Sequence, residues 1–392
     1  MVAPLLRIGC VLLAGAGLSA AASEVPRGPA APGGTPPPPH PRVALVLSGG
    51  GARGAAHIGV LEVLEELRVP VDLLVGTSIG AIVGGLYATG WTPDEMQQLV
   101  TNLDWTNDVF IDRVPRDERP FRRRADDRKP LIAAKLRFKD RFKPYLPLGV
   151  LGGQRLELLL RRLEIESTNE TDFDAFPVRY RAIAQDVITG EAVVLSQGSL
   201  ATAMRASMSI PGAFAPVELD GRSLVDGGGA ENLPIGTAVD LGAEAVVAVD
   251  ITSPLGTGAT SFLDVLNQSS SFLTVGNRAS SLKRLREGDV LIRPDLGEIT
   301  FFDFARAADA VGRGREAAQR LAERLRRFSV SEAEYAAWNE RRRRFPAPDP
   351  HAAEIRAQNT SWVSDEGVRR QIASMPSQFQ FSVDTALETV RR

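Results

Sequence analysis

The chain has 392 residues, 44% of them hydrophobic, and a formal net charge of −2 at pH 7. This length is enough to bury a sizeable core, which we expect as one large domain with appendages. The near-neutral charge carries no nucleic-acid-binding signature, and the single cysteine, Cys10, excludes a disulfide within the chain.

Residues 1–22 contain the three parts of a secretory signal peptide. Arg7 gives a positive start, residues 8–18 are apolar, and Ala20-Ala21-Ala22 is a small-residue cleavage site. The apolar run is too short to cross a bilayer, and a lipoprotein signal is disfavoured because almost no apolar run precedes Cys10. We therefore expect an exported protein, located in the periplasm, at the outer membrane or outside the cell. Residues 23–41 follow as a proline-rich linker.

The first strand is predicted at residues 43–47, whose continuous apolar character is typical of a strand covered on both faces. A glycine-rich loop follows, and it opens a helix predicted at residues 55–67. The loop reads Ser48-Gly49-Gly50-Gly51-Ala52-Arg53-Gly54. Backbone amides at such a helix N-terminus form a site for developing negative charge. The loop also matches a dinucleotide-binding pattern, but that pattern needs an acidic residue at the end of the second strand.

The second predicted strand, residues 71–75, ends instead in a candidate nucleophile. Gly76-Thr77-Ser78-Ile79-Gly80 has the Gly-x-Ser-x-Gly spacing, and a helix is predicted directly after it, at residues 81–87. A strand, this motif and a helix together predict a nucleophile elbow, a tight turn that exposes the serine hydroxyl. The motif alone is weak evidence, because a chain with 36 glycines will often contain one by chance.

The histidines limit which base could activate Ser78. His40 lies in the proline run, His351 lies in a later proline-rich stretch, and His57 lies one turn into the helix after the glycine loop. None of the three follows the nucleophile late in the folded core, where a Ser–Asp–His order would place it. We interpret His57 as a packed helix residue and expect a carboxylate to act as the base.

A basic segment at residues 113–143 interrupts the alternation of strands and helices. It has 13 Arg or Lys and 5 Asp or Glu, hence a net charge of +8, with phenylalanines interleaved. Such a segment fits a lid that contacts an anionic membrane surface. A solvated arm and a subunit contact, as in a homodimer, fit it equally well.

The remaining pattern predicts the fold. Further strands are predicted at residues 179–184, 192–195, 223–225 and 245–250, with helices at 93–102, 153–162, 200–208 and 233–241. This alternation predicts a three-layer α/β/α sandwich with a mostly parallel central sheet, in which ligands bind at the carboxyl ends of strands. Asp226 stands at such an end, before Gly227-Gly228-Gly229, and is the candidate base.

These three motifs, in this order, resemble those of the patatin-like phospholipase family, and residues 207–216 are similar to its segment ahead of the acid. The resemblance covers about residues 42–315. It implies a Ser–Asp dyad that hydrolyses acyl esters of lipids, with Ser78 as nucleophile and Asp226 as base. It also implies an oxyanion hole in the loop from Gly49 to Gly54. We expect neither a metal nor another cofactor.

The C-terminal part is predicted to lie outside the hydrolase domain. Residues 316–350 are expected to form a helical extension and linker, with one helix at 302–328 and another that begins at the capping box Ser331–Glu334. Residues 351–392 resemble the first half of a POTRA domain, the module that precedes outer-membrane barrels.

The sequence therefore predicts a secreted serine esterase that acts on phospholipids or lysophospholipids. A different hypothesis is a lipid-binding or assembly module of an outer-membrane secretion system with a vestigial hydrolase site. The intact Ser78 and Asp226 disfavour this second hypothesis.

Overall fold

The chain divides into two units, residues 1–39 and residues 40–392, and every described residue belongs to the second. The predicted signal peptide, proline-rich linker and POTRA-like segment lie outside the described residues, as does most of the basic segment. The computed structural model describes residues 42–105, 109, 153–168, 170–253 and 262–343, and the backbone of three short strands between residues 137 and 151.

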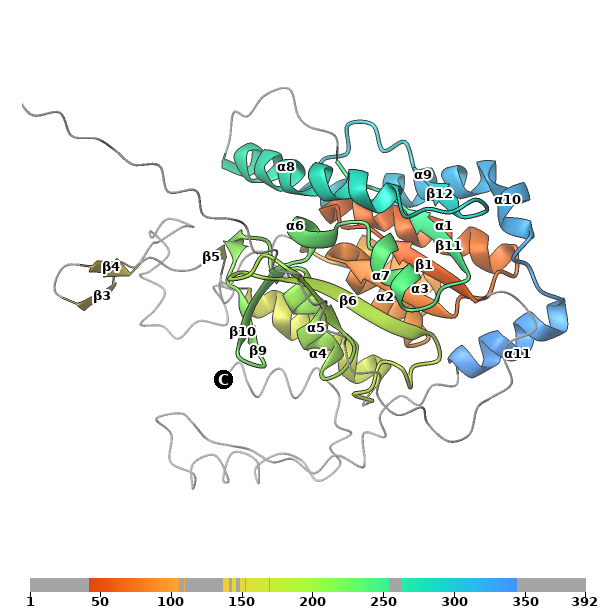
Figure 1. Ribbon diagram of the computed structural model, residues 1–392, viewed down its shortest axis with the longest axis horizontal. Coiled ribbons are helices and arrows are strands. Elements are labelled where there is room, and N and C mark those ends of the chain that lie inside the picture. The colour runs from red at the N-terminus through yellow and green to blue at the C-terminus, as the bar shows by residue number, and fades with distance from the viewer. Residues whose placement is uncertain are drawn as a thin grey trace, which may run out of the picture. The chain divides into compact units, whose positions relative to one another are not determined.

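An eight-stranded sheet forms the centre of the second unit (Figure 1). Its order is β12-β11-β1-β2-β6-β10-β9, and β7 pairs with β6. The five strands from β12 to β6 are parallel, whereas β7, β10 and β9 run antiparallel to their neighbours. The predicted mostly parallel sheet is confirmed. The bounds are β1 (Val43–Leu47), β2 (Leu73–Thr77), β6 (Arg179–Asp186), β7 (Ala192–Leu195), β9 (Val217–Leu219), β10 (Arg222–Asp226), β11 (Ala245–Val249) and β12 (Val290–Ile292).

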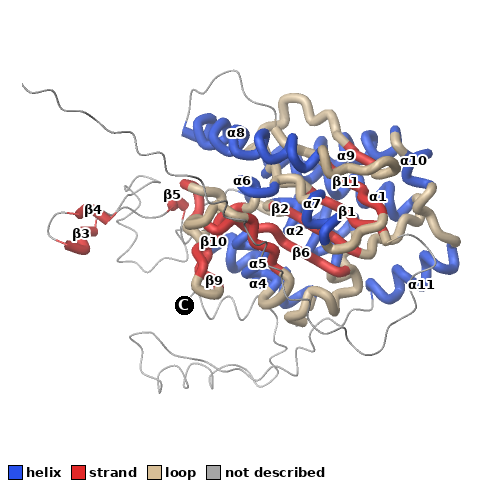
Figure 2. The backbone as a smooth tube through the Cα atoms, viewed as in Figure 1, coloured by secondary structure: helices blue, strands red, loops and turns tan. Residues whose placement is uncertain are grey.

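Helices cover both faces of this sheet, which confirms the predicted three-layer sandwich (Figure 2). Alternate side chains of β1 show the two faces: Val43, Leu45 and Leu47 join one hydrophobic cluster, and Ala44 and Val46 join the other. The first face is covered by α1 (Ala56–Glu66), α2 (Ile79–Ala88), α3 (Pro93–Asn102), α4 (Gln154–Ser167), α5 (Leu200–Ser207) and α9 (Ala307–Arg320). The second is covered by α6 (Gly228–Glu231), α7 (Ile235–Asp240) and α8 (Phe262–Leu282).

Several elements differ from the sequence prediction. The 21-residue helix α8 was not predicted, because its polar run Asn267–Ser271 has no helical pattern of apolar residues. The helix predicted at residues 302–328 is divided into the 3-10 turn η4 (Phe304–Arg306), α9 and α10 (Ala322–Arg326). The first helical turn begins at Phe304 and not at residue 302, because the preceding segment turns so that the Phe301 carbonyl accepts the amide of Ala52. The helix predicted at residues 55–67 begins as a 3-10 turn, η1 (Gly51–Ala55).

Four short strands outside the main sheet were also not predicted. The strand β3 (Arg137–Asp140) lies in the basic segment and forms an antiparallel pair with β4 (Lys143–Tyr145), which begins at the last residue of that segment. The strand β5 (Gly149–Leu151) pairs in parallel with β8 (Gly212–Phe214). Across the part of the chain that is described, no helix has the length and apolar character needed to span a bilayer.

The sheet register brings the three motifs to one edge. Leu47 of β1 pairs with Gly76 of β2, and Thr77 of β2 pairs with Ile183 of β6. Asp226 lies at this edge on a strand whose direction the sequence did not predict. The strand β10 runs antiparallel to β6 and pairs Asp226 with Ala184. The carboxyl end of β10 therefore stops level with the carboxyl ends of the parallel strands.

Candidate active site

Ser78 lies in the tight turn between β2 and α2. Its backbone has φ 57° and ψ −124°, a conformation that non-glycine residues rarely adopt. Glycine is required on both sides of it. A Cβ atom on Gly76 would lie 2.3 Å from the carbonyl oxygen of Gly80, and one on Gly80 would lie 2.4 Å from that of Leu47. The predicted motif thus folds as the strand–turn–helix geometry of a nucleophile elbow.

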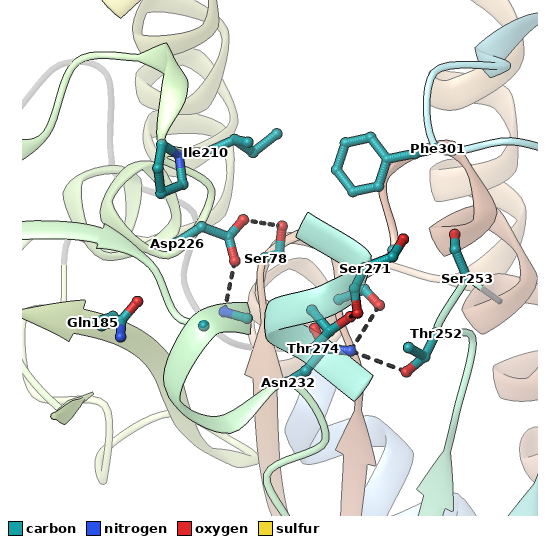
Figure 3. Close-up of a pocket in the computed structure, with 15 residues that line it drawn as sticks. Ser78, Gln185, Ile210, Asp226, Asn232, Thr252, Ser253, Ser271, Thr274 and Phe301 are labelled. Atoms are coloured by element: carbon teal, nitrogen blue, oxygen red, sulfur yellow. Dashed lines mark hydrogen bonds between the residues drawn. The ribbon is translucent and has the colours of Figure 1, made fainter. Parts of the chain in front are cut away.

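Asp226 lies directly against this serine (Figure 3). The Ser78 hydroxyl donates a 2.6 Å hydrogen bond to Oδ2 of Asp226, while Oδ1 accepts the amide of Gly228 at 2.8 Å. Gly227 allows the chain to turn here, because a Cβ atom on it would lie 2.3 Å from the Ile183 carbonyl oxygen. The structure therefore brings together the two residues, 148 apart in sequence, that were predicted to act as a pair.

Burial determines the charge state of this pair. The carboxyl group of Asp226 is withdrawn from solvent, which raises its pKa to about 6, and the hydrogen bonds from Ser78 and Gly228 offset part of that rise. The group is therefore ionised near neutral pH, yet it is more basic than an ordinary aspartate. A base works best when its pKa is near the working pH.

The segment from Ser207 to Ser209 accepts hydrogen bonds from the backbone amides of both Ser78 and Asp226. The amide of Ser78 donates to the hydroxyl of Ser207 at 2.8 Å, and that hydroxyl donates to the Ile183 carbonyl at 2.6 Å. The amide of Asp226 donates to the carbonyl of Ser209 at 2.9 Å. The sequence marked this segment only by its family resemblance, and the contact between Ser207 and Ser78 was not predicted.

The glycine loop lies against the nucleophile, since a Cβ atom on Gly49 would lie 3.0 Å from Cβ of Ser78. Two of its amides are already used: Gly49 donates to the Asn232 carbonyl and Ala52 donates to the Phe301 carbonyl. Within the described residues, the amides of Gly50 and Gly51 have no protein acceptor. The predicted oxyanion hole, residues 49–54, stays a prediction, and among these residues Gly50 and Gly51 have amides without an acceptor in the described part of the chain.

Arg53 and Gly54 have structural positions in this loop. The buried Arg53 guanidinium donates at 2.8 Å to the carbonyls of Ile251 and Ile299, which holds two later segments against the loop. Burial lowers the pKa of Arg53, and the nearby Asp250 acts in the opposite direction. Gly54 allows close packing on α2, because a Cβ atom there would lie 2.3 Å from Cγ1 of Ile79.

His57 is fully buried and supports the loop rather than the serine. Its Nε2 lies 2.9 Å from the carbonyl oxygen of Ser48, so the Nε2-protonated tautomer donates to the loop backbone. Burial lowers the pKa of His57 to about 4, which leaves the ring neutral at physiological pH. This agrees with the interpretation of His57 as a packed helix residue.

A pocket opens in front of Ser78, and its walls differ in polarity (Figure 3). The apolar wall consists of Ile210, Pro211 and Phe301. The polar wall consists of Asn232, Thr252, Ser253, Ser271 and Thr274, of which the last two belong to α8. Among the described residues, no group of His, Cys, Asp and Glu side chains is arranged to hold a metal ion.

Asn232 and Asn277 connect this wall to the catalytic motifs, and neither was predicted from the sequence. The Asn232 side chain donates to the hydroxyl of Thr252 at 3.0 Å, and the backbone carbonyl of Asn232 accepts the amide of Gly49 at 3.2 Å. Asn277, on α8, accepts the amide of Asn232 at 3.1 Å and donates to the carbonyl of Gly228 at 2.7 Å. These contacts join residues distant in sequence, so no local motif marks them.

Comparison with known families agrees with this geometry. Residues 45–239 match the sequence model of the patatin-like phospholipase family. The chain belongs to this family. The matched region includes the glycine loop, the elbow and Asp226, so all three motifs of this patatin-like chain lie inside it.

Similar proteins come from bacteria and animals. An uncharacterized NTE family protein of Mycobacterium tuberculosis is 33% identical over 211 residues, which cover 54% of this chain and 49% of the relative. The patatin-like phospholipase domain-containing protein 6 of Homo sapiens is 31% identical over 227 residues, which cover 57% of this chain and 14% of the relative. The patatin-like chain thus spans about half the length of the mycobacterial relative.

Two solved structures align with this chain at low sequence identity. VipD from Legionella pneumophila has a TM-score of 0.42 at 16% identity, over 73% of this chain and 67% of VipD. The type III effector ExoU from Pseudomonas aeruginosa has a TM-score of 0.35 at 17% identity, over 74% of this chain and 53% of ExoU.

Proposed function

We propose that the protein is a serine acyl hydrolase of lipids, of the phospholipase A or lysophospholipase type. The observation that carries this proposal is the 2.6 Å hydrogen bond from the Ser78 hydroxyl to Asp226, at a nucleophile elbow faced by a glycine loop. Family membership supports lipid hydrolysis as the general activity. The predicted signal peptide supports export to the periplasm, the outer membrane or the outside of the cell.

In the proposed reaction, Asp226 accepts the hydroxyl proton of Ser78 while Oγ attacks the acyl carbonyl carbon. The amides of Gly50 and Gly51 donate to the resulting oxyanion. The intermediate collapses to an acyl-serine, and Asp226 returns the proton to the departing alcohol. Asp226 then takes a proton from water, which attacks the acyl-serine. Collapse of this second intermediate releases the fatty acid, and Asp226 returns the proton to Oγ of Ser78.

The pocket supports an amphipathic substrate. Ile210, Pro211 and Phe301 provide an apolar surface for an acyl chain, and the polar wall between Asn232 and α8 provides hydroxyl and amide groups for a glycerol or head-group region. We propose a phospholipid or lysophospholipid on this basis. The basic segment 113–143 supports contact with an anionic membrane surface or with a second subunit, and vesicle binding at increasing salt distinguishes these roles.

Labelling with a fluorophosphonate, followed by hydrolysis of a defined phospholipid panel, tests the proposal. We expect the wild-type protein to be labelled at Ser78 and to release fatty acid detectable by mass. Ser78→Ala should abolish both signals, and Asp226→Asn should reduce both by several orders of magnitude, with circular dichroism unchanged. A folded wild-type protein that neither reacts nor hydrolyses any lipid would instead support the vestigial-site hypothesis.

A further inference from the structure

Two exposed apolar side chains lie next to each other at the turn between β6 and β7. Val187 is 49% exposed and Ile188 is 84% exposed, the highest value among the large hydrophobic residues that the structure describes. Scattered exposed apolar residues are normal on a protein surface. A consecutive pair at the tip of a turn needs a separate explanation, because it presents apolar surface where polar residues usually stand.

Hydrogen bonds fix the conformation of this turn. Oδ1 of Asp186 accepts the amides of Ile188 at 2.8 Å and Thr189 at 3.3 Å, and the Asp186 carbonyl accepts the amide of Gly190 at 2.8 Å. The Gln185 side chain donates to the carbonyl of Gly190 at 3.0 Å. Val187 and Ile188 are therefore displayed by an ordered turn, which loses little conformational entropy when it binds.

The turn stands beside the mouth of the candidate active site. Gln185 lines the pocket in front of Ser78 and pairs with Val225, the residue before Asp226. Val187 comes only two residues later, about 7 Å along an extended chain. The turn therefore projects from the edge of the sheet that carries the pocket.

We propose that the Val187–Ile188 turn inserts into a lipid bilayer and holds the pocket mouth against its surface. This rests on the proposed lipid substrate. Residues 187–190 contain no charged side chain, so the tip can enter an apolar environment without desolvating a charge. A second protein is a poorer occupant, because a stable interface buries about 800 Å² per partner and two side chains cannot supply that.

Vesicle binding in the Ser78→Ala background tests insertion without hydrolysis. We expect Ile188→Asp to weaken partitioning onto phosphatidylcholine vesicles by about tenfold or more, since it removes the contribution of one buried isoleucine. Ile165→Asp is the matched control. Ile165, on α4, is 48% exposed, which matches Val187. The neighbouring Glu164 accepts a hydrogen bond from the hydroxyl of Ser199, near the edge of the sheet opposite the one that carries the pocket. This control should bind like the parent.

A second variant reports the environment of the turn directly. Ile188→Trp should show a blue-shifted emission relative to the parent when vesicles are added, with quenching by brominated lipids. Failure of the parent to bind vesicles, or equal binding by Ile188→Asp, overturns the proposal. A blue shift that depends on protein concentration without vesicles identifies a second copy as the occupant and also overturns it.

Activity separates this proposal from the proposed function. With Ser78 intact, Ile188→Asp should lower hydrolysis of vesicle lipid by about tenfold while leaving kcat/KM on a short soluble ester unchanged. If no ester is hydrolysed by any variant, the proposed function fails. The binding and fluorescence results still decide the role of the turn, because they do not depend on catalysis.

Discussion

Burial of Asp226 beside Ser78 has two opposite consequences at the scale of the residue. It raises the pKa of the carboxyl group to about 6, which makes the carboxylate a better base for the serine proton. The same burial disfavours the charged form in the folded protein, so ionisation of Asp226 destabilises the fold. Activity and stability should therefore depend on the same titration with opposite signs.

The first prediction concerns activity. Only ionised Asp226 can accept a proton, so kcat/KM for a soluble ester should rise from acid pH and level off near neutrality, with an apparent pKa of about 6. His57→Gln should leave this acid limb in place, because His57 already has a pKa of about 4 and glutamine can still donate to Ser48. An acid limb that shifted or disappeared in His57→Gln would assign the base to the histidine.

The second prediction concerns stability. The folded-state pKa of Asp226, about 6, exceeds the ordinary value of 3.8, so the wild-type protein loses stability as pH rises through this window. Asp226→Asn removes that loss and should raise the free energy of unfolding at pH 7 by up to about 3 kcal/mol. The gain should shrink towards zero near pH 4. Urea unfolding at both pH values measures it, and an equal gain at pH 4 and pH 7 would contradict the assignment.

At the scale of elements, the end of α5 and the residues after it fix how β2 and β10 meet. The hydroxyl of Ser207, the last residue of α5, connects the amide of Ser78 to the carbonyl of Ile183 on β6. All three partners are buried, so no water can replace the hydroxyl without rearrangement. We infer that Ser207 is a positioning residue for the strained turn at Ser78.

The third prediction follows from this position. Ser207→Ala leaves the buried amide of Ser78 without an acceptor, which should destabilise the turn by about 1–3 kcal/mol. We expect kcat to fall about 10- to 100-fold with little change in KM, because the loss affects the nucleophile and not the pocket walls. Ser207→Thr retains the hydroxyl and should restore part of the activity. A Ser207→Ala enzyme with unchanged kcat would exclude this positioning role.

The elements that the sequence predicted well are those with strong local signals. The bounds of β1 and β7 were predicted correctly from their apolar character, and the bounds of α3 were also correct. In the structure, Thr92 caps α3 and forms a capping box with Glu95. Ser78 and Asp226 were found because a motif marks each position. Asn232, Asn277 and the antiparallel course of β10 were not, because they depend on contacts between segments distant in the chain.

At the scale of the whole described unit, the C-terminal helices are part of the main core. Tyr335 and Trp338, on α11 (Glu332–Arg343), join the same hydrophobic cluster as β1 and α2. The family resemblance covers about residues 42–315, so α11 lies beyond it. The basic run at residues 341–344 gives no sign in the sequence that one of its arginines is buried.

Arg342 is that arginine, and its side chain is only 1% exposed. Its guanidinium donates to the carboxylate of Glu65 at 2.7 Å and to the Trp91 carbonyl at 2.8 Å, and it stacks 4.1 Å from the centre of the Tyr87 ring. These contacts connect α11 to α1, to the ring at the end of α2 and to the loop after α2. Since Ser78 is the N-cap of α2, the same helix joins the nucleophile to this distant cluster.

The fourth prediction is that Arg342→Met destabilises the protein by about 3–5 kcal/mol in urea unfolding at pH 7, because it leaves Glu65 charged and without its cation. Arg341→Met, at an exposed neighbouring position, should change stability by no more than about 0.5 kcal/mol.

Burial already raises the pKa of Glu65, and loss of Arg342 should raise it further. A carboxyl group with a raised folded-state pKa destabilises above its unfolded pKa, so the cost of Arg342→Met should be smaller at pH 4 than at pH 7. Adding Glu65→Gln should recover part of the loss at pH 7 and none at pH 4. Equal losses at both pH values, with no recovery in the double variant, would mean that packing of the arginine stem and not its charge holds α11 in place.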